Sequence, residues 1–152
     1  MKQSFLFQQK RARLVGQSGW EVLLREFDPG DDKVQILAFS LGCELALAAM
    51  KAAISPGTIS QYIDALHLVG AAVPHHAVPA DIGIPISNIH SERDWILTHL
   101  YRRATGEVAA GTRGFLPGND RLENIPVGLG HTQYKHVAAL IAQRVRLFRP
   151  SD

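Results

Sequence analysis

Cysteine is almost missing from this chain. Cys43 is the only one among its 152 residues. A single thiol excludes an internal disulfide and a zinc site built on cysteines. A chain that uses so little cysteine suits a reducing compartment, so we expect a cytoplasmic location.

Long apolar segments are missing as well. Near the N-terminus only three apolar residues, Phe5 to Phe7, stand in a row before polar and charged residues follow, whereas a secretory signal needs about 7–15. The longest uncharged stretch, residues 65–80, is interrupted by two prolines and by His75 and His76. It is too short and too interrupted to cross a bilayer. The sequence therefore predicts neither a signal peptide nor a transmembrane segment.

A large excess of charge of one sign is also missing. Lys and Arg together number 16, Asp and Glu number 14, and aromatic residues make up 7%. Nucleic-acid-binding proteins usually gather basic residues on one face with aromatics among them, so we expect no nucleic-acid partner. We interpret the one basic cluster, Arg144, Arg146 and Arg149, as a solvated helix end. With 46% hydrophobic residues, the chain suits one folded domain over residues 1–152.

Strand and helix patterns alternate along the chain. Apolar runs of strand length indicate strands at residues 34–39, 65–73, 84–90 and 125–129. Apolar spacing and Ala/Leu content predict helices at residues 9–27, 43–54, 94–103 and 134–148. The glycine-rich stretch between the last two, residues 105–124, is predicted to be a loop, either a flap over a site or a connection. This alternation predicts an α/β fold, with a small parallel sheet of about four strands and helices on both faces.

Functional residues of parallel sheets gather where the strands end. Ser40 follows the first predicted strand and precedes an Ala-rich helix, with Ala38 and Gly42 two positions to either side. This pattern of small-x-Ser-x-small is typical of a nucleophile elbow, in which larger residues would collide with the neighbouring strand and helix. The elbow would place the Leu41 N–H at the helix N-terminus, as an oxyanion donor. The alternative is that Ser40 only caps the helix.

A nucleophilic serine needs a base, and the base needs a carboxylate that orients it. Asp94 follows the third predicted strand and His131 follows the fourth. The order Ser, Asp, His is the one found along α/β-hydrolase chains. Glu92 is a rival for the acid, but Asp94 sits at the turn into the next helix and is favoured. The alternative for Asp94 is that it only caps that helix.

Three further residues near the strand ends, His75, His76 and Trp95, are candidates for lining a pocket. The alternatives are ordinary loop histidines and a packing tryptophan. Adjacent histidines in an extended segment point in opposite directions and rarely bind one ion, and the sequence has no His-Glu-x-x-His motif. We therefore expect no metal and no cofactor, and we interpret Cys43 as a small core residue.

Four stretches carry a resemblance to a known family. They are ILAFSLGCELAL (36–47), LHLVGAAVP (66–74), NIHSERDWILTHLYR (88–102) and GLGHTQY (128–134). Together they resemble the α/β-hydrolase superfamily, and most closely a branch of unknown function that includes a transmembrane and coiled-coil domain-containing protein. The resemblance implies Ser40 as nucleophile, Asp94 as acid and His131 as base. The expected function is a serine hydrolase, esterase- or lipase-like, acting on a small-molecule or lipid ester. The alternatives are a non-catalytic hydrolase-like module for binding or assembly and, with less support, a small nucleotide-binding domain.

The sequence also departs from the family pattern. Ala38 stands where the motif has glycine, and only 39 residues precede Ser40, where a full hydrolase has several more strands. The loop that normally supplies a second oxyanion donor has no visible counterpart. We therefore expect a minimal or truncated hydrolase fold whose sheet edge beside residues 34–39 is covered by the N-terminal helix, by a second copy of the chain or by a complementing chain.

Overall fold

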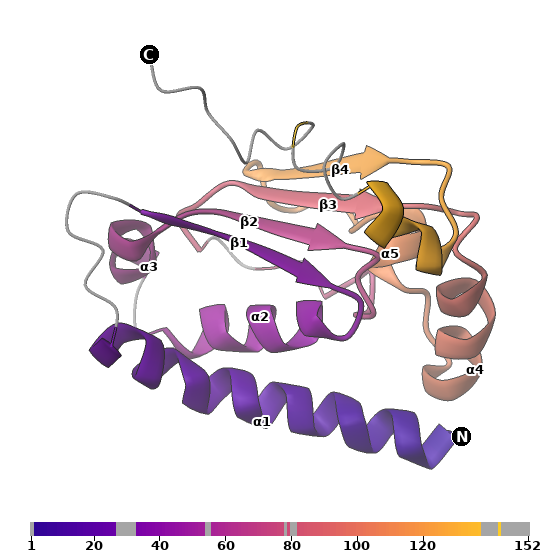
Figure 1. The fold of residues 1–152 in the computed structure, drawn as a ribbon, viewed down its shortest axis with the longest axis horizontal. Coiled ribbons are helices and arrows are strands. Elements are labelled where there is room, and N and C mark those ends of the chain that lie inside the picture. The colour runs from indigo at the N-terminus through magenta and orange to yellow at the C-terminus, as the bar shows by residue number, and fades with distance from the viewer. Residues whose placement is uncertain are drawn as a thin grey trace.

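The core of the structure is a four-stranded parallel sheet. The structure is a computed structural model that describes residues 2–26, 33–53, 56–77, 79, 82–137 and 143. The strands lie side by side in chain order and are β1 (Val34–Phe39), β2 (Ile63–Val69), β3 (Ile86–His90) and β4 (Leu122–Pro126). All three strand pairs are parallel, as Figure 1 shows by the common direction of the arrows. The predicted α/β fold with a small parallel sheet is therefore confirmed.

Seven helical segments connect and cover these strands in the described residues. They are α1 (Lys2–Glu26), α2 (Gly42–Ala52), α3 (Pro56–Tyr62), the π-helix η1 (Ile96–Tyr101), α4 (Arg102–Thr105), α5 (Ala110–Arg113) and the 3₁₀ helix η2 (His131–Val137). Helices α1 and α2 lie together on one face of the sheet (Figure 1). No helix in the described part of the chain combines the length and hydropathy that a membrane crossing requires.

The two faces of the sheet carry separate apolar clusters. On the α2 face, Leu66, Leu68 and Ile86 pack with residues of α1 and α2 into the main core. Side chains alternate along a strand, so the next residues point to the other face. There Val69, Ile89 and Ile125 pack against Tyr134 of η2. Helical residues therefore contact both faces of the sheet.

Several element boundaries differ from those predicted. Strand β2 covers residues 63–69 rather than 65–73, because Gly70 takes the left-handed conformation (φ 52°) and ends the strand. Strand β4 covers residues 122–126 rather than 125–129. Ile125 is the only buried residue of β4. The polar residues Glu123 and Asn124 precede it, so the first part of this strand lacks the apolar run that predicts a strand. Strand β3 begins two residues later than predicted, at Ile86, and β1 has the predicted bounds.

The helices differ in a similar way. Helix α1 begins at Lys2 rather than residue 9, and α2 spans residues 42–52 rather than 43–54. The segment predicted as one helix over 94–103 is a π-helix followed by an α-helical turn. The predicted loop 105–124 contains α5 and the start of β4. Of the predicted helix 134–148, residues 134–137 belong to η2, and most of the remainder, like residues 27 and 54, lies outside the described residues.

Candidate functional site

Ser40 occupies the turn between β1 and α2 in a backbone conformation that serine rarely adopts. Its φ is 52°, and it is the only non-glycine residue with positive φ among the described residues. The neighbouring strand holds this turn in place. The Ser40 N–H donates to the carbonyl of Val69 at 2.9 Å, and the Ser40 carbonyl accepts from the N–H of Ala72 at 3.2 Å. These bonds offset the strain of the turn, which typically costs about 1–3 kcal/mol, and the turn has the backbone form of an elbow.

The structure brings Ser40, His131 and Asp94 into one chain of contacts. The Oγ of Ser40 lies 3.0 Å from Nε2 of His131, and Nδ1 of His131 lies 2.6 Å from Oδ2 of Asp94. The serine follows β1, the aspartate follows β3 and the histidine follows β4, so all three lie at the carboxyl edge of the sheet. A carboxylate can only accept here, so Nδ1 carries the proton and Nε2 is left to accept the Ser40 hydroxyl.

Both carboxylate oxygens of Asp94 are engaged. Oδ1 accepts the N–H of Leu97 at 3.0 Å and thereby caps the start of η1. Oδ2 contacts His131, and the Asp94 side chain is fully buried. The two roles left open for this residue, helix cap and histidine partner, are thus filled by different oxygens of one group. Glu92, the rival acid, is exposed and lines a separate hollow.

Aromatic rings enclose the imidazole of His131, whose side chain is 12% exposed. The Phe39 ring lies 4.9 Å from it, centroid to centroid, at an interplanar angle of 34°. The Tyr134 ring stands perpendicular to it at 6.3 Å. Burial raises the pKa of the Tyr134 hydroxyl, with the Asp94 charge adding to the effect. These rings restrict the imidazole to the orientation in which it reaches both partners.

Phe39, Gly70 and Tyr134 also belong to the site, although no motif in the sequence predicts this. A Cβ on Gly70 would lie 3.0 Å from the Tyr134 ring and 3.5 Å from Oδ2 of Asp94, so glycine leaves room for both. Two signals were available in the sequence. Phe39 immediately precedes the serine, and Tyr134 follows His131 by three residues, which is one turn of a 3₁₀ helix.

The small residues around Ser40 have unequal roles. Ala38 is buried in the main core, as expected of the elbow. Gly42, however, is exposed, and a Cβ there would meet no atom of another element within 4 Å. The expected collision at Gly42 is therefore wrong, because no described segment packs against this side of the first turn of α2. Leu41 lies between Ser40 and the first residue of α2, so its N–H belongs to the helix N-terminus.

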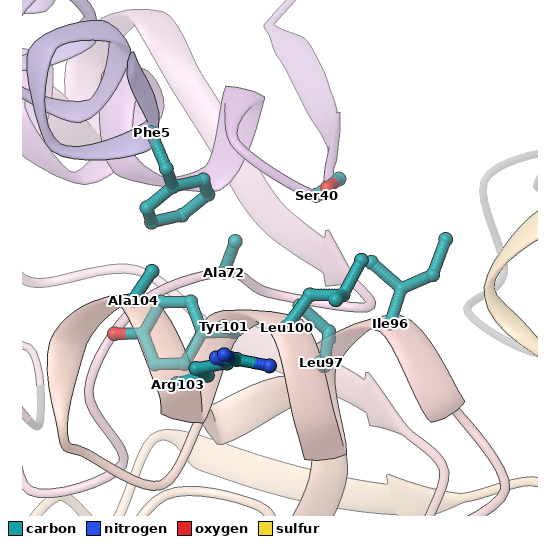
Figure 2. A pocket seen from close by; sticks show the side chains of 9 residues that line it. All are labelled: Phe5, Ser40, Ala72, Ile96, Leu97, Leu100, Tyr101, Arg103 and Ala104. Carbon is teal, nitrogen blue, oxygen red and sulfur yellow. The ribbon is translucent and has the colours of Figure 1, made fainter. Parts of the chain in front are cut away.

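An apolar cavity of about 480 Å³ opens beside Ser40. The side chains in Figure 2 come from Ser40 after β1, from Ala72 after β2, from α1 and from the segment of η1 and α4. The three pocket candidates do not line it. His76 is exposed 3.8 Å from Glu107, His75 lies next to it, and Trp95 stacks on His99 at the surface.

The described residues offer little for metal or thiol chemistry. They contain no group of three or more His, Cys, Asp or Glu side chains arranged to hold a metal ion. Cys43 is fully buried beneath the elbow, with Sγ 3.3 Å from the carbonyl of Ala38. Burial raises the pKa of this thiol to about 12. Cys43 is therefore an uncharged core residue at neutral pH, and not a nucleophile.

Comparison with known proteins places the chain in one family. The model of a family described as protein of unknown function (DUF726) matches residues 1–148, so the chain belongs to this family. No curated protein matches the sequence.

Proposed function

We propose that this member of the DUF726 family is a serine hydrolase that cleaves an ester or related acyl bond through an acyl-enzyme. The observation that carries the proposal is the unbroken chain of contacts from Ser40 through His131 to the buried Asp94. The simpler alternatives are that Ser40 only caps one helix and that Asp94 only caps another. Neither simpler role accounts for a histidine from a third strand end that contacts both side chains.

In the proposed mechanism, Ser40 attacks the ester carbonyl as Nε2 of His131 takes the proton from its Oγ. Asp94 stabilises the resulting imidazolium through Nδ1–H. The negative oxygen of the tetrahedral intermediate accepts from the Leu41 N–H, where the α2 dipole adds to the stabilisation. Collapse of the intermediate breaks the bond to the alcohol, which leaves with the proton from Nε2.

The acyl-enzyme is then hydrolysed by the same groups. His131 takes a proton from water, whose oxygen attacks the acyl carbon, and the second tetrahedral intermediate releases the carboxylic acid and returns the proton to Ser40. Every group that takes part in these reaction steps is a side chain or backbone group of the protein, the ester substrate or a water molecule. The burial of Asp94 and the low exposure of His131 support the mechanism, because electrostatic interactions are stronger away from water.

Hydrolysis of a short-chain ester such as p-nitrophenyl butyrate tests the proposal. Ser40→Ala should lower kcat/KM by at least about a thousandfold, since removal of a triad serine leaves only binding and oxyanion contributions. Ser18→Ala is a matched control, because Ser18 is exposed on α1 and, among the described residues, bonds only to the carbonyl of Leu14. Equal turnover by the Ser40→Ala variant and the wild type would refute the proposal.

One observation favours the alternative of an assembly module. No described strand pairs with the outer edge of β1, and Leu37 and Phe39 there are each 47% exposed. Helix α1 packs along α2 and not along this edge. A second copy of the chain, paired edge to edge through β1, would satisfy its free backbone groups.

A further inference from the structure

The cavity beside Ser40 is large enough to bind part of a substrate. Its volume of about 480 Å³ falls within the range of small-molecule sites, about 300–1,000 Å³. Ala72, Leu97 and Ala104 line it as buried apolar residues, whereas the charged lining residue, Arg103, is exposed and therefore lies at the mouth. A cavity of this composition suits a hydrocarbon chain rather than a sugar or a phosphate.

The position of the cavity relative to Ser40 and His131 indicates which half of an ester it receives. The leaving alcohol must stay near Nε2 of His131, which gives it a proton, while the acyl group stays bonded to Ser40 Oγ. Ser40 lines the cavity and His131 does not. The acyl chain therefore has direct access to the cavity, and the alcohol remains on the side of the imidazole.

The end of the cavity away from Ser40 is formed by two rings. Phe5 and Tyr101 meet edge to face with centroids 5.7 Å apart. In Figure 2 the two rings lie on the side of the cavity opposite to Ser40 and Ile96. Tyr101 is 2% exposed and fixed in the π-helix, while Phe5 is half-buried on α1. The length of the cavity therefore depends on Phe5, near the start of the described chain.

Helix α1 holds Phe5 in this position. Gln9 and Arg13 follow Phe5 at intervals of four residues, on the same face of the helix. Both donate to the carboxylate of Glu44 on α2, Gln9 at 3.1 Å and Arg13 at 2.5 Å. Glu44 is itself buried and lies four residues after Ser40. The polar contact therefore fixes the ring of Phe5 relative to the serine.

We infer that this cavity is the acyl site for a hydrocarbon chain of the ester substrate, and that Phe5 limits the length of that chain. The inference rests on the proposed serine hydrolase function. It assigns Phe5 a role in specificity rather than in the chemical steps, because its ring lies at the end of the cavity opposite to the serine.

A series of n-alkyl fluorophosphonates whose alkyl group on phosphorus lengthens from methyl to dodecyl tests the inference. The second-order rate constant for modifying Ser40 is measured by intact mass. For the wild type it should rise with length, by up to about fourfold per methylene buried, and then stop rising once the cavity is filled. Phe5→Ala should move that limit to longer chains, and Phe5→Trp to shorter ones.

Phe7→Ala is the matched control, because Phe7 lies on the same helix, is 59% exposed and does not line the cavity. It should leave the length profile unchanged. Modification of Ser40 at the same rate by all chain lengths would overturn the inference and leave the serine hydrolase proposal standing. Failure of every reagent to modify Ser40 would overturn the proposed function, and the acyl site with it. The wild-type series decides between these outcomes even if a Phe5 variant does not fold.

Discussion

At the scale of single residues, Asp94 shows how one side chain serves both the fold and the proposed chemistry. One of its oxygens caps η1 and the other contacts His131, and burial excludes water from both. The cap fixes the direction of the carboxylate, and the carboxylate fixes the direction of the imidazole. Removing the side chain would abolish both the helix cap and the proposed orienting contact. An isosteric change to asparagine keeps the cap and alters only the contact with His131.

Asp94→Asn should lower ester turnover far more than Glu92→Gln. The asparagine oxygen can still cap η1, but its amide nitrogen facing His131 would favour the imidazole with Nδ1 unprotonated. Nε2 would then carry the proton and could not accept one from Ser40. The loss for a comparable change is about 10⁴-fold. Measuring kcat and thermal unfolding of both variants checks this, since Asp94→Asn should remain folded. A larger loss for Glu92→Gln would assign the orienting role to Glu92.

At the scale of elements, the packing of α1 on α2 depends on one close approach. A Cβ on Gly16 would lie 2.2 Å from the backbone carbonyl oxygen of Leu45 and 3.0 Å from the side chain of Ala48. Four residues later the buried ring of Trp20 enters the main core. Glycine thus lets α1 lie against α2 at the level where the side chains of Gln9 and Arg13 reach Glu44.

Two glycine substitutions in α1 should have opposite effects. Gly19→Ala meets no atom within 4 Å, and alanine is favoured over glycine in a helix by about 1 kcal/mol, so the free energy of unfolding should rise. Gly16→Ala should lower it by about 1–3 kcal/mol, as overpacking does. Chemical denaturation of both variants measures the difference. A Gly16→Ala protein as stable as Gly19→Ala would show that α1 does not approach α2 this closely.

The elements that the sequence predicts best are those whose signal is local. β1 has a nearly continuous apolar run that ends at the elbow, and its bounds agree with the prediction. Among the described strands β4 pairs with β3 alone, and its Glu123 and Asn124 are exposed, so the sequence pattern there favours a loop. The side chain of Asn124 also bonds to the backbone of Phe115, a contact that arises only from the tertiary fold.

The candidate site likewise has parts that local sequence patterns predict and parts that arise only from the tertiary fold. Ser40, Asp94 and His131 follow strand ends, and residues in those positions can be named from a sequence because parallel strands end at a common edge. The cavity could not be predicted in this way. It lies between Phe5 on α1 and the segment of η1 and α4, and no periodicity in the sequence indicates that these two helical segments meet. His75 and Trp95 are close to strand ends, but their position there does not set the direction of their side chains.

At the scale of the whole molecule, His67 makes stability depend on pH. The side chain is 3% exposed, its Nε2 pairs with Oε1 of Gln35 at 3.1 Å, and its Nδ1 has no partner among the described residues. Burial lowers its pKa below the ordinary 6.5, although the Asp64 charge opposes the shift. Below pH 6.5 the unfolded chain therefore takes up a proton that the folded protein resists, so acid favours unfolding.

We expect the wild type to lose stability as pH falls below about 6.5, by at most about 1.4 kcal/mol per pH unit from this group. His67→Gln can still donate to Gln35 and does not titrate, so its stability should fall less over the same range. The other six histidines are common to both proteins. Denaturation midpoints at pH 7.5, 6.5 and 5.5 test this, and parallel pH profiles for the two proteins would contradict it.

The open edge of β1 leads to an expectation about assembly. If a second copy covers this edge, light scattering should give a mass near twice 16.7 kDa that falls toward the monomer on dilution. Leu37→Lys should favour the monomer, because charge on an edge strand opposes pairing. A monomer at every concentration, for both proteins, would exclude pairing between copies.

The central claim is that Ser40 is a nucleophile activated by His131, and covalent labelling tests it most directly. A fluorophosphonate probe should modify the folded wild type at a single site, which peptide mapping should locate at Ser40. Ser40→Ala should take up no label, His131→Ala should react far more slowly, and the buried Cys43 should remain unmodified. Equal labelling of the wild type and Ser40→Ala, or no labelling of the folded wild type, would contradict the claim.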